Sequence, residues 1–430
     1  MKGSAHRNDI RVSQPRHFWG ELLRRLFWSG GLTLFFAAAL LRAQDAPGTG
    51  NTPTMQLGPV KINITGSFEV EFNDNINFSR TNRVYDIILR PGLTVAANDV
   101  LNDNNTLALQ LGIAWDEYLI HNNLSSYSNF ADISPDSKLA YTIRLPPFTF
   151  SVYDSFNYSV QPTDSLAFNP ATGQVLTNVR DFGRFMNQIG ASVDLDMNRV
   201  VPYAGIYRYD VFPIQSEFDF LRRWQYTASV GVRYDINPKL QAKLDANYTL
   251  NYYKVHLEND SSSWYIGGTL SGTVGSTLTL NGTLGFTGYN FKSNGSNGDN
   301  TQPETYTGSL SASQKLSNNI QHTFTLTRAS NYGYVSNTLA VDRVDYKIEY
   351  QHFLLPLMVG TLELYYEQGD DSGGLAPETY KKYVITPSVN YKLTKRSEWY
   401  ASYQFTQKFS NFSERNYYQN QIIIGFRYNF

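Results

Sequence analysis

The chain has 430 residues, no cysteine, 15% aromatic and 17% charged residues, and a formal net charge of −1. The absence of cysteine excludes a disulfide framework and any thiolate ligand or nucleophile, and the near-zero charge argues against a nucleic-acid partner. A negative mean hydropathy excludes a bundle of membrane helices, but a membrane β-barrel passes this test because half of each strand is polar.

The N-terminus has the organisation of a secretory signal peptide, which we predict over residues 1–43. Basic residues precede an apolar core from Leu26 to Leu41, and Ala43 stands before the expected cleavage point. An uncleaved anchor helix is the alternative, and the core is short for a membrane span. Residues 44–59 are rich in Gly, Pro and Thr and are predicted to be a periplasmic linker.

From residue 60 to the end, apolar and polar residues alternate in long segments. Alternation places successive side chains on opposite faces of a strand. One example has Leu278, Leu280, Leu284 and Phe286 on one face and Thr279, Asn281, Thr283 and Thr287 on the other. The segments run for roughly 11–16 residues, against a mode of about 5–6 in soluble sheets. We count about eighteen, starting near residues 60, 84, 105, 137, 148, 183, 200, 222, 239, 263, 276, 304, 319, 342, 357, 380, 398 and 418.

Short and long connections alternate between these segments. Short ones lie near residues 146–147, 198–199, 237–239, 317–319 and 394–396, and long ones span 74–83, 121–135, 161–181, 213–221, 291–303, 331–341 and 369–379. Periplasmic turns and longer outer loops alternate in this way in membrane barrels. An open sheet edge in lipid would leave backbone groups unpaired. The sequence therefore predicts an all-β fold, one closed antiparallel transmembrane barrel of about 18 strands over 60–430, with 16 as the lower count.

The last strand ends on an aromatic residue and carries alternating apolar residues before it. We interpret Phe426, Tyr428 and Phe430 as an assembly signal read by the barrel-assembly machinery, after delivery by periplasmic chaperones. This predicts a location in the cell outer membrane, in contact with its lipid.

The opening of the predicted barrel, from Gly66 to Ile76, reads Gly-Ser-Phe-Glu-Val-Glu-Phe-Asn-Asp-Asn-Ile. This stretch resembles the start of a family of beta-barrel porins of Gram-negative bacteria. The resemblance implies an outer-membrane barrel without an assigned substrate. Some members of that family are linked to exopolysaccharide production.

Charged residues of both signs occupy the predicted inward face. Placing them toward lipid would cost roughly 2–4 kcal/mol each near the midplane. The residues expected to face the lumen are Glu69, Glu71, Asp86, Arg90, Asp116, Arg144, Arg184, Asp194, Arg208, Asp210, Arg223, Arg233, Lys243, Asp245, Lys347, Glu349, Glu363, Lys392, Lys408 and Arg427. They form a structural network of ion pairs, the polar wall of a pore, or both.

No catalytic constellation is evident. After the signal the chain has only His121, His256, His322 and His352, without a spacing that would join them to a nucleophile. We predict no enzyme activity, no cofactor and no metal.

The function expected is a passive, weakly ion-selective, water-filled channel for small polar solutes. An accessory barrel for polysaccharide export or secretion, a non-conducting surface or adhesion barrel, and a soluble extracellular β-protein are the alternatives. A homo-oligomer is left open. Substrate choice would come from long loops such as 161–181.

Overall fold

The computed structural model describes residues 53–125, 131–159, 167–169, 174–176, 183–295, 302–333, 336–373 and 377–430. The predicted signal peptide and most of the predicted linker lie outside these residues. The end of the linker folds back on the barrel, because β1 (Met55–Leu57) pairs with the start of β2. Among the described residues no helix is long and apolar enough to cross a bilayer.

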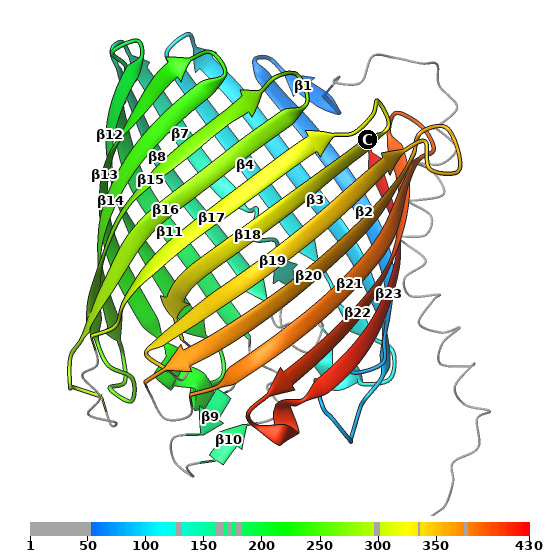
Figure 1. The fold of residues 1–430 in the computed structure, drawn as a ribbon. Coiled ribbons are helices and arrows are strands. Elements are labelled where there is room, and N and C mark those ends of the chain that lie inside the picture. The colour runs from blue at the N-terminus through cyan, green and yellow to red at the C-terminus, as the bar shows by residue number, and fades with distance from the viewer. Residues whose placement is uncertain are drawn as a thin grey trace, which may run out of the picture. The chain divides into compact units, whose positions relative to one another are not determined.

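Within the described residues, eighteen long antiparallel strands form one closed wall. Each pairs with the next along the chain, and the last pairs with the first (Figure 1). The strands are β2 (Val60–Asn73), β3 (Asp86–Asn102), β4 (Asn105–Ala114), β7 (Lys138–Leu145), β8 (Phe148–Ser159), β11 (Arg184–Leu195), β12 (Val200–Pro213), β13 (Arg223–Asn237), β14 (Leu240–Tyr253), β15 (Ser261–Val274), β16 (Leu278–Phe291), β17 (Glu304–Lys315), β18 (Ile320–Tyr332), β19 (Thr338–Gln351), β20 (Met358–Ser372), β21 (Thr379–Lys392), β22 (Ser397–Ser410) and β23 (Tyr417–Asn429).

Short elements decorate this wall. Two short strands lie on the chain between β4 and β7: β5 (Glu117–Tyr118) pairs with β3, and β6 (Asp132–Ile133) pairs with both β4 and β8. A separate hairpin, β9 (Ala167–Asn169) and β10 (Gln174–Leu176), is the described part of the long loop 161–181. Three 3₁₀ helices lie in the described loops: η1 (Asn122–Leu124), η2 (Ser216–Leu221) and η3 (Ser413–Arg415).

The predicted barrel is confirmed, and every predicted strand start lies within four residues of an observed one. Short turns gather at one end of the barrel and long loops at the other, as Figure 1 shows. We call these the turn end and the loop end. The first described residues and the C-terminus share the turn end, where the Thr54 hydroxyl donates to the Phe430 carbonyl at 2.7 Å.

The outer face of the wall is apolar because alternation sends one side chain in two away from the lumen. Leu244, Ile206 and Leu284 are 62%, 66% and 65% exposed. Apolar surface of this kind is unfavourable in water and favourable in hydrocarbon. The face therefore suits a bilayer, which agrees with the predicted location in the outer membrane.

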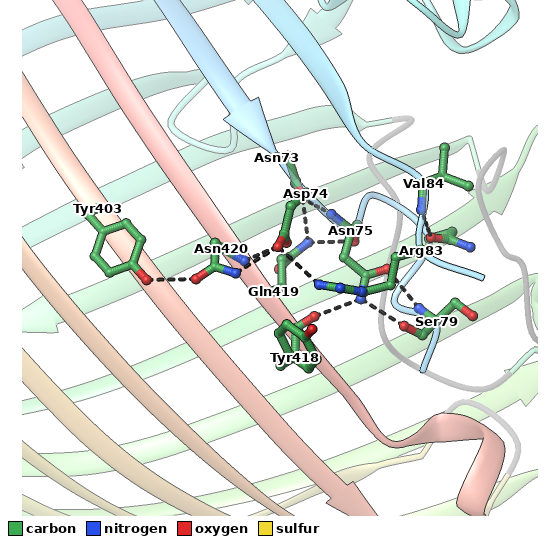
Figure 2. Close-up of polar contacts among 11 residues, drawn as sticks. Asn73, Asp74, Asn75, Ser79, Arg83, Val84, Tyr403, Tyr418, Gln419 and Asn420 are labelled. Carbon is green, nitrogen blue, oxygen red and sulfur yellow. Dashed lines mark hydrogen bonds and ion pairs between the residues drawn. The ribbon is translucent and has the colours of Figure 1, made fainter. Parts of the chain in front are cut away.

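The barrel closes where β2 meets β23. The backbone pairing there runs from Thr65↔Asn429 to Asn73↔Gln421, and β2 continues toward the turn end against β1 instead. Beyond Asn73, side chains extend the closure toward the loop end (Figure 2). We call the residues that do so, Asn73, Asp74, Asn75, Gln419 and Asn420, the clasp.

Asp74 joins the two strands from both its backbone and its side chain. Its N–H donates to the Asn420 carbonyl at 3.1 Å. Its carboxylate accepts from the backbone and side-chain nitrogens of Asn420, each at 2.7 Å, and from Arg83 at 3.3 Å. Arg83 also lies 4.1 Å over the Tyr418 ring.

Asn75 is fully buried beneath this contact. Its amide nitrogen donates to the carbonyls of Tyr418 at 2.7 Å and Ser79 at 2.9 Å, and its oxygen accepts from the Ser79 N–H at 2.9 Å. On the last strand, the Gln419 side chain donates to the Asn73 side chain at 3.0 Å and to the Asn75 carbonyl at 2.9 Å. The Asn-Asp-Asn stretch of the opening motif thus connects the first strand to the last.

Candidate functional site

The inner face of β2 and β3, together with Asp116 just after β4, forms a charge cluster centred on Arg90. Its guanidinium lies 3.2 Å from Glu69, 3.5 Å from Glu71 and 2.5 Å from Asp116. The register pairs Glu69 with Arg90 directly across the two strands, so alternation brings them to one face. Tyr400 of β22 donates to Glu69 from across the closure. One cation therefore serves three carboxylates that the chain separates by up to 47 positions.

A second group of inward charges lies on β19 to β22. Arg343 contacts Asp345 at 2.5 Å and Glu367 at 3.7 Å, and Lys382 contacts Glu367 at 3.3 Å. Lys408 reaches Glu378, in the loop before β21, at 3.3 Å. Lys382 and Lys408 are direct partners across β21 and β22, but each lies against a carboxylate.

The remaining predicted lumen charges follow the same face. Ion pairs join Arg233 to Asp194 at 3.3 Å, Lys243 to Asp245 at 3.0 Å, Lys347 to Glu349 at 3.2 Å and Arg427 to Glu398 at 4.0 Å. Asp86 is fully buried and lies 2.8 Å from the His121 ring. By register, Arg144, Arg184, Arg223, Glu363 and Lys392 lie on this face too, each on a different strand, and Arg184 and Arg223 line one small cavity near the loop end. The charges are therefore spread around the wall and do not converge on one centre.

Two predicted lumen residues lie on the opposite face. Arg208 and Asp210 are paired by register with Tyr226 and Trp224, which belong to the outer apolar row of β13. The interpretation fails because β12 inverts the usual pattern: its tyrosines 203, 207 and 209 face inward and its charges face outward. Arg208 bonds Asp210 at 3.0 Å and lies 5.5 Å over the Tyr226 ring.

Other outward polar contacts were missed by the sequence interpretation. Asn187 donates to Asp154 at 2.5 Å on the outer face of β11 and β8, and Arg328 bonds Asp342 at 2.6 Å on β18 and β19. Strict alternation from Val152 would have placed Asp154 outside. Arg328 and Asp342 lie within a few residues of the loop end, where a long side chain can reach headgroups and water.

At the loop end, residues pack over the inner face in two places. Beyond Arg328, β18 leaves β17 but stays paired with β19. The hairpin leans over the inner face, so that Tyr332 reaches Ser263 of β15 at 3.2 Å and Tyr289 of β16 donates to the Ser330 carbonyl at 3.0 Å. Near the closure, the loop residues Ile76 and Leu124 and the β5 residue Tyr118 form an apolar cluster with Ile88, which faces inward from β3.

The predicted assembly-signal residues lie at the turn end of β23. Phe426 packs on Trp399 with ring centroids 5.0 Å apart, and Tyr428 packs on Phe430 at 5.1 Å. Both Phe426 and Tyr428 are buried. Their role in assembly stays a prediction.

Together these features define a large membrane β-barrel with an apolar outer face and a charged, hydrogen-bonded inner face. No protein-family model matches the sequence, and no curated protein matches it.

Solved structures do match the fold. A BenF-like porin from Pseudomonas fluorescens Pf-5 aligns with a TM-score of 0.51 and 12% identity, over 87% of this chain and 100% of that one. OccK2 (OpdF) from Pseudomonas aeruginosa, solved in complex with glucuronate, aligns with a TM-score of 0.52 and 10% identity, over 87% of this chain and 99% of that one. At this identity the likeness concerns the fold, which is that of outer-membrane porins.

Proposed function

We propose that the protein is a passive outer-membrane channel that admits small polar solutes and discriminates only weakly between cations and anions. The observation that carries the proposal is the inner face of the closed wall, where charges of both signs occur mainly as pairs. Barrels of 16–18 strands enclose an aqueous lumen unless they are plugged. OccK2, a porin of this fold, is known with glucuronate bound, and a small polar solute of that size suits such a lumen.

Weak selectivity follows from the pairing of the charges. Arg233 with Asp194, Lys243 with Asp245 and Lys347 with Glu349 each present opposite charges within 3.3 Å. At the pore axis each such pair acts as a dipole, and its electrostatic potential is screened over a Debye length of about 8 Å at physiological salt. An ion in the lumen therefore meets little net potential, and selectivity should grow at low salt.

The test is conductance of the purified, refolded protein in a planar bilayer under a salt gradient. We expect stable channels with a reversal potential close to zero that moves away from zero as the salt is diluted. A barrel that never conducts would favour a surface or adhesion role. A reversal potential near the ideal value for one ion would contradict weak selectivity, and a channel that opens only with a periplasmic partner would favour an export accessory.

A further inference from the structure

One sector of the inner wall, four adjacent strands wide, carries rows of hydroxyls and almost no charge. On β15, β16, β17 and β18 the register aligns inward residues in rows, and one row consists of Thr269, Thr283, Ser309 and Thr327. Two further rows toward the turn end hold only Ser, Thr and Asn. We call this sector the hydroxyl panel.

The hydroxyl panel is bounded by charge on both sides. The same row continues to Lys243 on β14 and to Arg343 on β19. From Ser261 to Thr327, the described inward residues of these four strands include one charge, Lys315, which lies at the turn end. The panel is thus a neutral strip between charged flanks. A second row of inward hydroxyls, Thr106, Thr142, Ser151 and Ser192, lies on β4, β7, β8 and β11, but these strands also carry inward charges, namely Lys138, Arg144, Arg184 and Asp194.

Hydroxyls of the hydroxyl panel bond to one another and remain partly exposed. Thr269 and Thr283 lie 3.0 Å apart, and Thr325 donates to Ser311 at 3.1 Å. A hydroxyl both donates and accepts, as the hydroxyls of a polyol do. Replacing water on such groups costs less than stripping water from a charge. A neutral polyhydroxylated solute can therefore exchange its hydrogen bonds with water for hydrogen bonds with this strip.

Tyr265 adds an aromatic platform to the hydroxyl panel. Its ring crosses Gly267 and Gly285, where any side chain would collide with it, so the ring lies flat on the wall. Tyr203 and Tyr400 lie over Gly231 and Gly425 in the same way, but Lys243 and Arg427 sit 5.2 and 5.5 Å over their rings. Among the described residues no cation lies over Tyr265. A flat ring beside hydroxyls offers an apolar face to the C–H groups of a sugar and polar partners to its hydroxyls.

At the turn end the hydroxyl panel opens into a recess of about 610 Å³. Ser271, Thr273, Thr279 and Asn281 line its panel side, and the other side is lined by Gln241 and by three charged residues, Arg199, Asp235 and Lys239. Sites for small molecules commonly have volumes of about 300–1,000 Å³. The recess is large enough for a small saccharide that leaves the strip.

We propose that the hydroxyl panel with Tyr265 is a low-affinity track for uncharged saccharides through the lumen. This inference rests on the proposed channel function and names its solute class. Neutral sugars should interact with the open pore more strongly than sugar acids of the same size.

The experiment measures the block of single-channel KCl current by maltose in planar bilayers. We expect a concentration-dependent block, and Tyr265→Ala should raise the half-blocking concentration about fivefold, since a ring contact of this kind is worth about 1 kcal/mol. Tyr265→Phe should retain the wild-type value because the ring remains. Tyr203→Ala is the matched control, since it removes a flat inward tyrosine that a lysine covers.

Further variants test the proposal even if Tyr265→Ala does not fold. Thr283→Val removes one hydroxyl at constant volume and should weaken the block, whereas Thr142→Val, on an inward hydroxyl of β7, should not. In liposome swelling, glucose should enter faster than gluconate. A pore that conducts KCl without any block by maltose, or in which Tyr203→Ala and Tyr265→Ala act alike, would overturn the inference and leave the channel intact. Absence of any conductance would overturn the channel and the inference together.

Discussion

Replacing Asn75 by alanine should weaken the barrel where its first and last strands meet. The side chain is fully buried and makes three hydrogen bonds, to the Tyr418 carbonyl and to the carbonyl and N–H of Ser79. Each such bond contributes about 1 kcal/mol net, so Asn75→Ala should lower the free energy of unfolding by about 3 kcal/mol. Backbone groups left unpaired on β23 and in the loop after β2 account for the loss.

The assay is urea unfolding of the refolded protein in lipid vesicles, followed by tryptophan fluorescence and by heat-modifiable gel mobility. Asn290→Ala is the control, because Asn290 is exposed near the loop end of β16 and accepts one long bond, of 3.5 Å, from Gln302. We expect the control to change the free energy of unfolding by less than about 0.5 kcal/mol. Equal stability of the two variants would refute the role assigned to the clasp.

Further predictions concern orientation, assembly, selectivity and pH. A membrane-impermeant thiol reagent on intact cells should label Ser293→Cys in an outer loop and spare Pro238→Cys in a turn; the reverse result would invert the orientation. Deleting Phe430 should reduce the folded protein in outer-membrane fractions, and unchanged levels would remove its role in assembly. Arg90→Gln leaves three carboxylates without their cation, so the reversal potential should shift toward cation selectivity, and an unmoved potential would contradict the pairing argument. Burial in the loop before β15 raises the pKa of Glu258 from 4.5 to about 7, against the opposing charge of Arg223. Since the folded pKa is the higher one, the stability this group contributes is present at low pH and is lost as pH rises through about 7. The loss in the free energy of unfolding should reach about 3 kcal/mol. In Glu258→Gln the thermal midpoint should therefore decrease less than in the parent when the pH is raised from 5 to 8, and an equal decrease in both proteins would exclude Glu258 as the cause.

The sequence alone predicted the architecture because the hydropathy pattern of each strand reflects which of its faces meets lipid and which meets water. Period-two alternation over long segments, short and long connections in turn, and an aromatic C-terminal strand are local patterns. Lipid on one side and water on the other force that alternation, so the strand starts and the closed barrel were readable from one chain.

The facing of individual residues was less secure. It held where a strand alternated cleanly, as with Glu69 and Arg90, and failed at Arg208 and Asp210. In β12 three of the inward positions are tyrosines, and one of them, Tyr203, lies over Gly231 of β13. The sequence of one strand does not show which residues of the neighbouring strands its side chains will pack on. The hydropathy pattern of β12 therefore predicted the wrong face for Arg208 and Asp210.

Contacts between strands far apart in the chain were decided by the tertiary structure. Asn73-Asp74-Asn75 is visible as a motif, yet its partners Gln419 and Asn420 become partners only when the barrel closes over more than 340 positions. The hydroxyl panel is likewise a property of register, since Thr269, Thr283, Ser309 and Thr327 form a row only when four strands align. Sequence determines which face each residue prefers, whereas backbone hydrogen bonding between strands decides which residues meet on that face.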